Sequence, residues 1–360
     1  MKGKKPELLA PAGNFVSLNA AISAGCDAVY FGIKNFNMRQ GAKNFTLEDL
    51  KEISKQCKEN NVKAYLTLNI IAYDEESDKF EEIIKEAKGK VDAIICWDQL
   101  IIQLCKKHKV PFHISTQASI SNSSSAKFYK ELGAERIVFA RECSLEQIKQ
   151  ILENVKIESE VFVHGAMCVA VSGRCFMSQF SYGKSANRGQ CLQNCRREYG
   201  VNKTSCSNEH HIKDVDREFE FNLGNNYVMS AKDLCTIPFL EKLMDFDSFK
   251  IEGRNRSPEY VSTVVKVYRK AIDLAYENKL TKEIKEELME ELKTVYNRGF
   301  SNGFYLGKPI NEFTDEYGSK ATTKKEFVGK IVNYYSKNNV AEIIVESNTF
   351  EKGNKLMIQG

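Results

Sequence analysis

The chain has little tryptophan, proline and histidine, and it has no long apolar run. Its 360 residues include one Trp, six Pro and five His. No stretch approaches the roughly 18 apolar residues that a membrane-spanning helix needs. The basic residues at the start are followed only by Leu8–Ala10 before Pro11, which is too short for the apolar region of a secretory signal. These absences predict a cytoplasmic protein with no membrane partner.

Charge of either sign is not in large excess, and classical hydrolase motifs are absent. The chain has 52 Lys and Arg against 48 Asp and Glu, which gives a formal net charge of +4. This balance argues against a polybasic protein but permits a local basic site. Neither H-E-x-x-H nor G-x-S-x-G occurs, so the sequence names no metal-bound water or serine nucleophile for proteolysis.

Cysteine, in contrast, is plentiful, with eleven residues. Thiols stay reduced in the cytoplasm, which argues against a disulfide framework. Some of the cysteines fall inside expected strands or helices, where free cysteine usually packs as a small apolar residue. These are Cys26, Cys57, Cys96, Cys105 and Cys143.

Short β-like runs alternate with amphipathic helical runs over the first two-thirds of the chain. The expected strands are rich in Val, Ile, Tyr and Phe, as buried parallel strands are. They are Glu7–Ala10, Ala28–Gly32, Lys63–Asn69, Ala93–Trp97, Phe112–Thr116, Arg136–Ala140, Glu158–His164 and Ser248–Glu252. The expected helices are Phe15–Ala24, Leu47–Asn60, Ser77–Lys88, Leu100–His108, Ser123–Leu132, Leu145–Glu153 and Pro258–Tyr276.

Eight strand–helix units predict an α/β fold, a (β/α)8 TIM-like barrel. A doubly wound open sheet is the alternative that spacing alone leaves open. The barrel is favoured because polar residues, such as Asn69, Arg141 and Glu252, follow the expected strands. In a barrel those carboxyl ends converge on one mouth.

The pattern divides the chain into three parts. Residues 1–280 are expected to form the barrel, including a cysteine-rich insertion at residues 165–235 after the seventh strand. A loop this long is normally functional. Residues 281–325 form an expected helical and aromatic connector, and residues 326–360 alternate like the start of a small C-terminal β-barrel-like domain. That pattern stops midway at Gly360, which predicts that the chain is truncated there.

The stretch His164–Arg197 is the most informative part of the insertion. It contains five basic residues and neither Asp nor Glu. Its cysteines are Cys168, Cys175, Cys191 and Cys195. Clustered thiolates beside uncompensated positive charge indicate a metal or iron–sulfur centre next to an anion-binding surface.

The spacing of these cysteines matches neither the paired C-x2-C knuckles of zinc ribbons nor the C-x2-C-x2-C run of ferredoxins. A fold can still bring four separated thiolates together. Cys206 and Cys235 raise the number of thiols available in this region to six. An iron–sulfur cluster is the favoured interpretation, and a structural zinc or plain packing are the alternatives.

Basic and aromatic side chains accompany the cysteines. Guanidinium groups suit carboxylates and phosphates. The candidates for anion binding are Arg174, Lys184, Arg188 and Arg254. Phe176, Phe180 and Tyr182 lie among them and can stack on bases or on a substrate ring. A solvated basic loop is the alternative.

Six motifs together resemble the collagenase-like peptidase family U32. They are ELLAPAGN at Glu7–Asn14, DAVYFG at Asp27–Gly32, HGAMCVAVSGRC at His164–Cys175, NRGQCLQNCR at Asn187–Arg196, SAKDLC at Ser230–Cys235 and SFKIEGR at Ser248–Arg254. The resemblance covers nearly the whole chain. It implies either collagenase-like proteolysis or hydroxylation, because several members are implicated in hydroxylating the wobble uridine of tRNA, a ribosomal RNA cytidine or a ubiquinone precursor.

The resemblance also implies a site and partners. Its hydroxylating members carry a 4Fe-4S cluster, whose ligands map to Cys168, Cys175, Cys191 and Cys235, with Cys195 as an alternative. The C-terminal β extension is most similar to the branch that makes 5-hydroxyuridine in tRNA. The implied partners are tRNA, a small dicarboxylate co-substrate such as prephenate, and a second copy or another family member in a dimer.

The proton-handling residues expected at the mouth are His164 and Glu252. The thiolate set and the acid-free basic loop favour an RNA-modification enzyme. A collagenase-like peptidase is the first alternative, and a non-catalytic binding module stabilised by zinc is the second.

Overall fold

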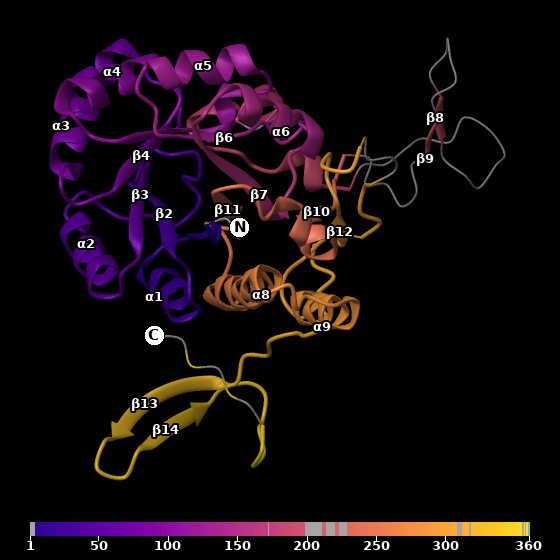
Figure 1. Cartoon of the computed structure of the whole chain (residues 1–360). Coiled ribbons are helices and arrows are strands. Elements are labelled where there is room, and N and C mark those ends of the chain that lie inside the picture. Colours follow the sequence, from indigo (N-terminus) through magenta and orange to yellow (C-terminus); the bar gives the residue numbers. More distant parts are fainter. Residues whose placement is uncertain are drawn as a thin grey trace. The chain divides into compact units, whose positions relative to one another are not determined.

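The computed structural model describes residues 4–171, 173–198, 211–213, 220–222, 229–307, 312–316, 318–354, 356 and 358. The chain divides into two compact units, Met1–Lys320 and Ala321–Gly360. Figure 1 shows the first unit as a ring of strands surrounded by helices. Over the ranges just given, no helix has both the length and the apolar character needed to cross a membrane.

Within the described residues, eight parallel strands close the barrel. They are β1 (Glu7–Pro11), β2 (Ala28–Gly32), β3 (Lys63–Thr67), β4 (Ala93–Cys96), β5 (Phe112–Ile114), β6 (Arg136–Val138), β7 (Glu158–Ala166) and β11 (Ser248–Ile251). Each pairs with the next, and β11 closes the ring by pairing with both β7 and β1. The predicted (β/α)8 fold class is therefore confirmed.

Helices cover the outside of the barrel (Figure 1). They are α1 (Phe15–Ser23), α2 (Leu50–Glu59), α3 (Ser77–Ala87), α4 (Gln99–His108), α5 (Ser123–Glu131), α6 (Leu145–Asn154) and α8 (Pro258–Tyr276). The short helix α7 (Met177–Tyr182) lies within the insertion, and α9 (Lys282–Lys293) follows α8. Ser144 caps α6 as its side chain accepts a hydrogen bond from the backbone N–H of Gln147.

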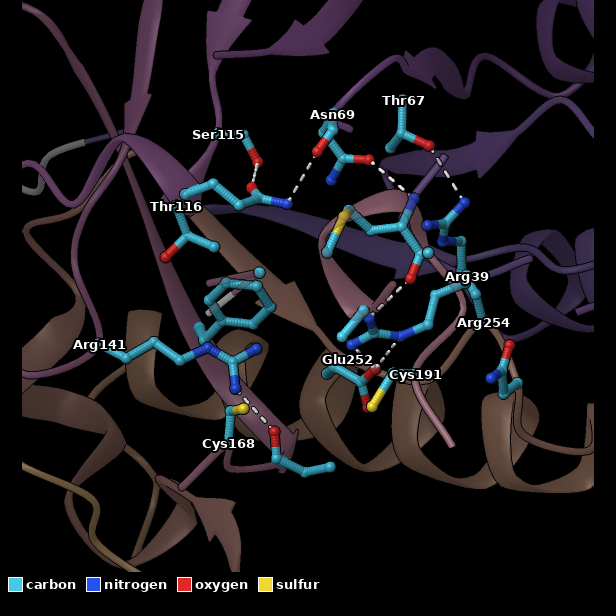
Figure 2. Close-up of a pocket in the computed structure, with 18 of the residues that line it drawn as sticks. Arg39, Thr67, Asn69, Ser115, Thr116, Arg141, Cys168, Cys191, Glu252 and Arg254 are labelled. Atoms are coloured by element: carbon cyan, nitrogen blue, oxygen red, sulfur yellow. Dashed lines mark hydrogen bonds and ion pairs between the residues drawn. The ribbon is translucent and has the colours of Figure 1, made fainter. Parts of the chain in front are cut away.

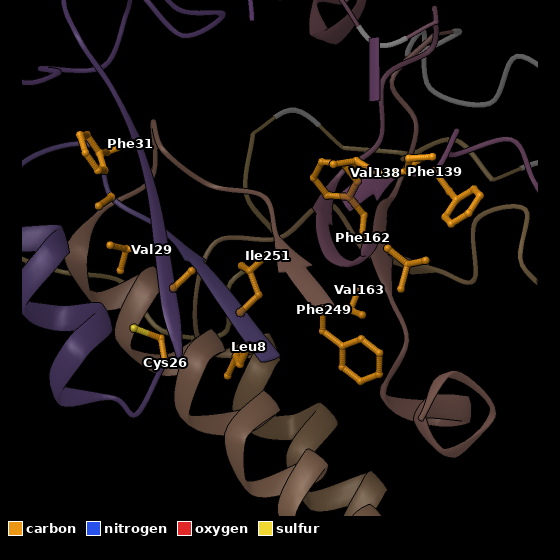
Figure 3. Packing of buried hydrophobic residues seen from close by; sticks show 14 of the residues in the cluster. Leu8, Cys26, Val29, Phe31, Val138, Phe139, Phe162, Val163, Phe249 and Ile251 are labelled. Atoms are coloured by element: carbon orange, nitrogen blue, oxygen red, sulfur yellow. The ribbon is translucent and has the colours of Figure 1, made fainter. Parts of the chain in front are cut away.

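Alternation along the strands separates two packing layers. On β1, Leu8 belongs to the large cluster between the strands and the helices, whereas Leu9 belongs to a small cluster inside the barrel. On β2, Val29 and Tyr30 divide in the same way. Figure 3 shows Leu8 and Val29 in the outer layer. This division follows from the two-residue period of a strand.

The amino-terminal end of the barrel interior holds a balanced set of charges. The side chain of Arg136 is 3% exposed and lies 2.5 Å from the carboxylate of Glu7, 2.8 Å from that of Glu158 and 3.3 Å from that of Glu160. The ammonium group of Lys250 lies 2.7 Å from the Glu160 carboxylate. Because each buried charge has a partner of opposite sign, the interior is stable without bound ions.

An antiparallel addition flanks the barrel beside the insertion. Strand β10 (Asp233–Cys235) pairs antiparallel with β7, and β12 (Phe300–Ser301) pairs parallel with β10. Further along the insertion, β8 (His211–Lys213) and β9 (Glu220–Asn222) form a small antiparallel pair.

The second unit contains an antiparallel hairpin. Its strands are β13 (Gly329–Tyr335) and β14 (Val340–Val345). The unit begins at Ala321, whereas the sequence places the start of the C-terminal β segment at residue 326.

The buried charge network gives the first prediction. Replacing Arg136 by Met removes the buried cation beside Glu7 and leaves Glu160 with Lys250 alone, so we expect the free energy of unfolding to fall by about 3–5 kcal/mol. Urea denaturation measures this change. The control is Lys149→Met, which removes an exposed ion pair with Asp245 and should cost less than about 1 kcal/mol. Equal effects of the two substitutions would contradict the network.

Candidate functional site

A cavity opens at the carboxyl ends of the barrel strands, beside residues 167–197, which are called the cysteine segment below (Figure 2). Residues from β3, β4, β6, β7 and β11 line it, together with the loop after β2 and the cysteine segment. This is the end of the barrel at which enzymes of this fold place their active sites.

Two glycines allow close packing around the cavity. A Cβ atom at Gly32 would collide with the guanidinium group of Arg254. Gly189 has a φ of +88° and lies against the backbone of Asn37 in the loop after β2. A side chain at either position would displace Arg254 or the cysteine segment. These contacts give a physical reason for one glycine in each of the DAVYFG and NRGQCLQNCR motifs.

Positive charge dominates the cavity wall. Among its described lining residues, six are cations and one, Glu252, is a carboxylate. The cations are Arg39, Arg141, Arg196, Lys250, Arg254 and Arg298. A recess lined by charge of one sign concentrates ligands of the opposite sign, so this cavity is suited to an anion.

Glu252 and Arg39 form an ion pair in this wall. Oε1 of Glu252 lies 3.1 Å from Nη2 of Arg39 and 3.4 Å from its Nε. Burial alone would raise the pKa of Glu252, but the guanidinium groups of Arg39, Arg256 and Arg141 lower that pKa to about 2. Glu252 therefore lies at the mouth, as expected, but it is ionised at neutral pH and orients cations.

Two further arginines keep donors available to a ligand. Arg254 donates a hydrogen bond to Oγ1 of Thr67 at 3.1 Å, and burial lowers its pKa to about 10, so it remains charged at neutral pH. Arg141 donates to the carbonyl of Ala166 at 2.7 Å. The buried Nε of Arg141 has no hydrogen-bond partner among the described residues. Each guanidinium can therefore still bind a carboxylate.

A second wall carries uncharged amide and hydroxyl groups, and Figure 2 shows it across from Glu252 and Arg141. The side-chain nitrogen of Gln117 donates to the backbone carbonyl of Asn69 at 3.2 Å, and Ser115 donates to the Gln117 side-chain oxygen. Oδ1 of Asn69 accepts a hydrogen bond from the backbone N–H of Met38 at 3.3 Å. The two amides present polar edges to the cavity without adding charge.

Four cysteines of the cysteine segment line the same cavity. They are Cys168, Cys175, Cys191 and Cys195. Burial raises the pKa of Cys195, and the thiols of Cys168, Cys191 and Cys175 lie close enough to raise it further. Arginines lie near these thiols. Arg39 is close enough to Cys191, and Arg141 and Arg196 are close enough to Cys168, for a charge on the sulfur to affect the pKa of the guanidinium group.

The donor set suits an iron–sulfur cluster better than a single metal ion. Wherever side chains are described, no three His, Cys, Asp or Glu are close enough together to hold one ion. A zinc ion with Zn–S bonds of about 2.3 Å needs sulfurs about 3.8 Å apart. A 4Fe-4S cluster binds four thiolates at separate corners of a cube, so its ligands lie farther apart. The four thiols that line the cavity supply the number and type of ligands that such a cluster needs.

Cys235 lies apart from this group. It is 1% exposed on β10, where it packs 3.5 Å from the sulfur of Met289 and 3.7 Å from the hydroxyl of Tyr268. Burial raises its pKa to about 11. Cys235 does not line the cavity, whereas Cys195, the alternative ligand, does. Cys206, also considered from the sequence, lies outside the described residues.

The structure turns His164 away from the mouth. A β-bulge shifts the register of β7 so that Ile251 opposes His164 two positions after Lys250 opposes Phe162. The extra residue reverses the alternation of side chains. His164 consequently packs beside Tyr268, with ring centroids 5.4 Å apart, and burial lowers its pKa to about 3. The expectation that His164 handles protons at the mouth is therefore corrected.

Of the four predicted anion-binding residues, one lines the cavity and three do not. Arg254 lines the cavity. Arg188 instead forms an ion pair with Glu76, with Nη1 2.8 Å from Oε2. Arg174 and Lys184 are exposed and do not line the cavity.

Sequence reasoning placed Arg141 at the mouth but not among the anion-binding residues, and it missed other cations. Arg39 lies in the loop after β2, so a search of every strand-to-helix loop for basic residues would have found it. Lys250 lies inside a strand, where its side chain is usually assigned to structure. Arg298 comes from beyond the barrel and reaches the site through a 3.2 Å ion pair with Asp233, for which the sequence gives no signal.

The buried position of His164 predicts a pH effect on stability. The unfolded chain takes up a proton on this side chain near pH 6.5, whereas the folded chain does so only near pH 3. The stability that the neutral side chain contributes is therefore complete above about pH 6.5 and is lost as the pH falls toward 3.

Replacing His164 by Gln should flatten the decline of unfolding free energy over that window by up to about 1.4 kcal/mol per pH unit. Urea denaturation of both proteins at several pH values measures the two slopes. Parallel slopes would show that His164 is protonated in the folded protein and therefore accessible.

Known proteins resemble this chain over nearly its whole length. A model described as Peptidase family U32 matches residues 13–315. A protein named collagenase, from Porphyromonas gingivalis, is 42% identical over 98% of this chain and 86% of its own length. The tRNA hydroxylation protein P1 of Bacillus subtilis is 39% identical over 99% of this chain and 84% of its own length. The tRNA hydroxylation protein P of Escherichia coli is 32% identical over 98% of this chain and 85% of its own length. This chain belongs to peptidase family U32.

Proposed function

We propose that this protein is an enzyme that hydroxylates the wobble uridine of tRNA to 5-hydroxyuridine, using a 4Fe-4S cluster and a dicarboxylate co-substrate such as prephenate. The observation that carries the proposal is a single cavity in which four thiols lie among arginines. The names of the Bacillus subtilis and Escherichia coli relatives support tRNA hydroxylation. Modification of tRNA would place the protein in the cytoplasm.

Proteolysis is the second candidate, because the relative from Porphyromonas gingivalis is named collagenase. The cavity gives it little support. No histidine is among the described residues that line it, and Ser115 donates its hydroxyl hydrogen bond to Gln117 rather than to a base. His164 faces away, so it forms no nucleophile–base pair with Cys168. Hydrolysis of gelatin by the pure protein would favour the peptidase.

The proposed cluster would be held by Cys168, Cys175, Cys191 and Cys195. When bound, it would supply electron-transfer chemistry. The excess of arginines supports this assignment, because a cluster held by four thiolates carries negative charge that adjacent guanidinium groups would balance. A zinc-stabilised binding module is the remaining alternative, and the spread of the thiols argues against it.

The arginines would bind and orient the co-substrate. Arg254 is fixed by Thr67, and Arg39 is fixed by Glu252, so both guanidinium groups are already positioned before a ligand arrives. Two such groups can bind the two carboxylates of one dicarboxylate by paired hydrogen bonds. Arg141, with its unpaired buried Nε, is a third donor at the same wall.

The uncharged wall would receive the pyrimidine base. Uracil presents two carbonyl oxygens and one N–H group along one edge, and the amides of Asn69 and Gln117 offer complementary donors and acceptors. A base held there lies in the same cavity as the thiols and the arginines. A tRNA base reaches such a recess only after it leaves the stack of its neighbours.

The ligand assignment predicts different metal contents for two serine variants. Anaerobically purified wild-type protein should be brown and contain about four iron and four sulfide per chain. Cys195→Ser should lose most of that iron, because it removes one of the four thiols at the cavity. Cys235→Ser is the matched control and should retain it. Loss of iron only from the Cys235 variant would reverse the assignment, and a colourless protein with one zinc would reject the cluster.

The co-substrate assignment predicts a loss of modification in Arg39→Gln. Removing a charge-assisted hydrogen bond of about 1.5–3 kcal/mol should lower the apparent affinity for the dicarboxylate about 10- to 100-fold. A bacterial strain lacking its own tRNA hydroxylation protein is complemented with each variant, and its tRNA nucleosides are profiled. Arg269→Gln, on α8 and paired with Asp27, is the control and should restore 5-hydroxyuridine derivatives. Failure of the wild-type gene to restore them would reject the proposed reaction.

A further inference from the structure

The outer face of the cysteine segment carries exposed aromatic rings. Phe180 is 86% exposed, Phe176 is 61% exposed and Tyr182 is 50% exposed. Phe180 and Tyr182 lie in α7, and Phe176 is the residue that precedes it. Large apolar side chains are rarely left this exposed together unless the surface has a partner.

These rings share one short piece of chain with the proposed cluster ligands, but they do not line the cavity. Three of the cysteines that line the cavity are each followed by an exposed apolar residue. Those residues are Val169, Phe176 and Leu192. The same segment therefore lines the cavity with thiols and also exposes apolar side chains.

Two of the aromatic rings lie side by side. The ring centroids of Phe176 and Phe180 lie 6.0 Å apart. The guanidinium carbon of Arg197 lies 5.0 Å from the centroid of the Tyr182 ring. The backbone N–H of Leu192 donates a hydrogen bond to the Ser178 hydroxyl at 3.0 Å. This bond holds the residue after Cys191 against α7.

The charge around the rings is positive. Arg174 is exposed two residues before Phe176, and Lys184 is exposed just after α7. No Asp or Glu occurs between residues 164 and 197. A protein partner or a second copy of this chain would require only the apolar rings. Rings bordered by cations without acids are instead the combination that binds single-stranded nucleic acid.

We propose that Phe176, Phe180 and Tyr182 form a stacking surface for unpaired bases of an RNA loop, with Arg174, Lys184 and Arg197 binding its phosphates. This proposal rests on the proposed function, since it names how the same site holds its tRNA. Bases adjacent to the target stack on the rings, and the target base is thereby free to enter the cavity that the cysteines of the same segment line. Stacking tolerates different bases, so this surface recognises the single-stranded loop rather than its sequence.

The test measures RNA binding without any co-substrate, so that it does not depend on turnover. The probes are a fluorescent anticodon stem-loop with uridine at the wobble position and a fully paired RNA duplex of equal length. The variants are Phe176→Ala/Phe180→Ala and, as the matched control, Phe128→Ala on α5, whose ring is also exposed. Iron content and thermal unfolding of each variant report whether the fold and the proposed cluster are intact.

We expect the wild-type protein to prefer the stem-loop to the duplex. The double variant should bind the stem-loop at least about fivefold more weakly, because each stacked base contributes substantially to affinity. Phe128→Ala should bind like wild type. In the complemented strain, the double variant should lower 5-hydroxyuridine while Phe128→Ala does not.

The outcomes that overturn this inference differ from those that overturn the proposed function. Equal stem-loop binding by wild type and the double variant, or equal binding of stem-loop and duplex, rejects the stacking surface even if tRNA hydroxylation is intact. A change in oligomeric state of the double variant, with unchanged RNA binding, rejects it in favour of a protein interface. Weakened stem-loop binding supports it even if no 5-hydroxyuridine is formed and the proposed reaction fails.

Discussion

The imbalance of charge between the two ends of the barrel is the constraint on which the rest of the site depends. At the amino-terminal end, Arg136 and Lys250 are matched by glutamates, and no further ion is needed. At the carboxyl end, five further cations line a cavity with one carboxylate, and one of them, Arg298, is already paired with Asp233. Buried cations need anions nearby. In the proposed function, thiolates of the cysteine segment and the carboxylates of a co-substrate supply them.

Glu252, the single carboxylate among the described lining residues of the cavity, positions a neighbouring arginine but is too little negative charge to neutralise the cations there. Glu252 holds Arg39 in place, and its low pKa keeps it anionic under all physiological conditions. Because it is paired with several guanidinium groups, it cannot also serve as a proton donor near neutral pH. In the proposed function, the cavity therefore binds anions beside the cysteines, and Glu252 does not act as the acid of a hydrolysis.

Much of the fold could be predicted from local sequence patterns. Features that depend on the pairing of strands far apart in the sequence could not. The strands are short apolar runs and the helices are amphipathic, so their order and type could be predicted from the sequence. The orientation of His164 could not, because the bulge in β7 is set by its pairing with β11 rather than by local sequence. Prediction also brought Cys168, Cys175 and Cys191 together, and they line one cavity, but the position of Cys235 away from that cavity depends on the antiparallel pairing of β10 with β7. Arg39 was missed because its loop carries no recognisable motif.

The most direct measurement is an anaerobic crystal structure of the protein with diffraction data collected at the iron absorption edge. The account predicts an anomalous iron peak in the cavity, in contact with the sulfur atoms of Cys168, Cys175, Cys191 and Cys195 and facing the arginines. An iron peak bound through Cys235, anomalous signal only at the zinc edge, or no metal in a protein that still hydroxylates tRNA would contradict it.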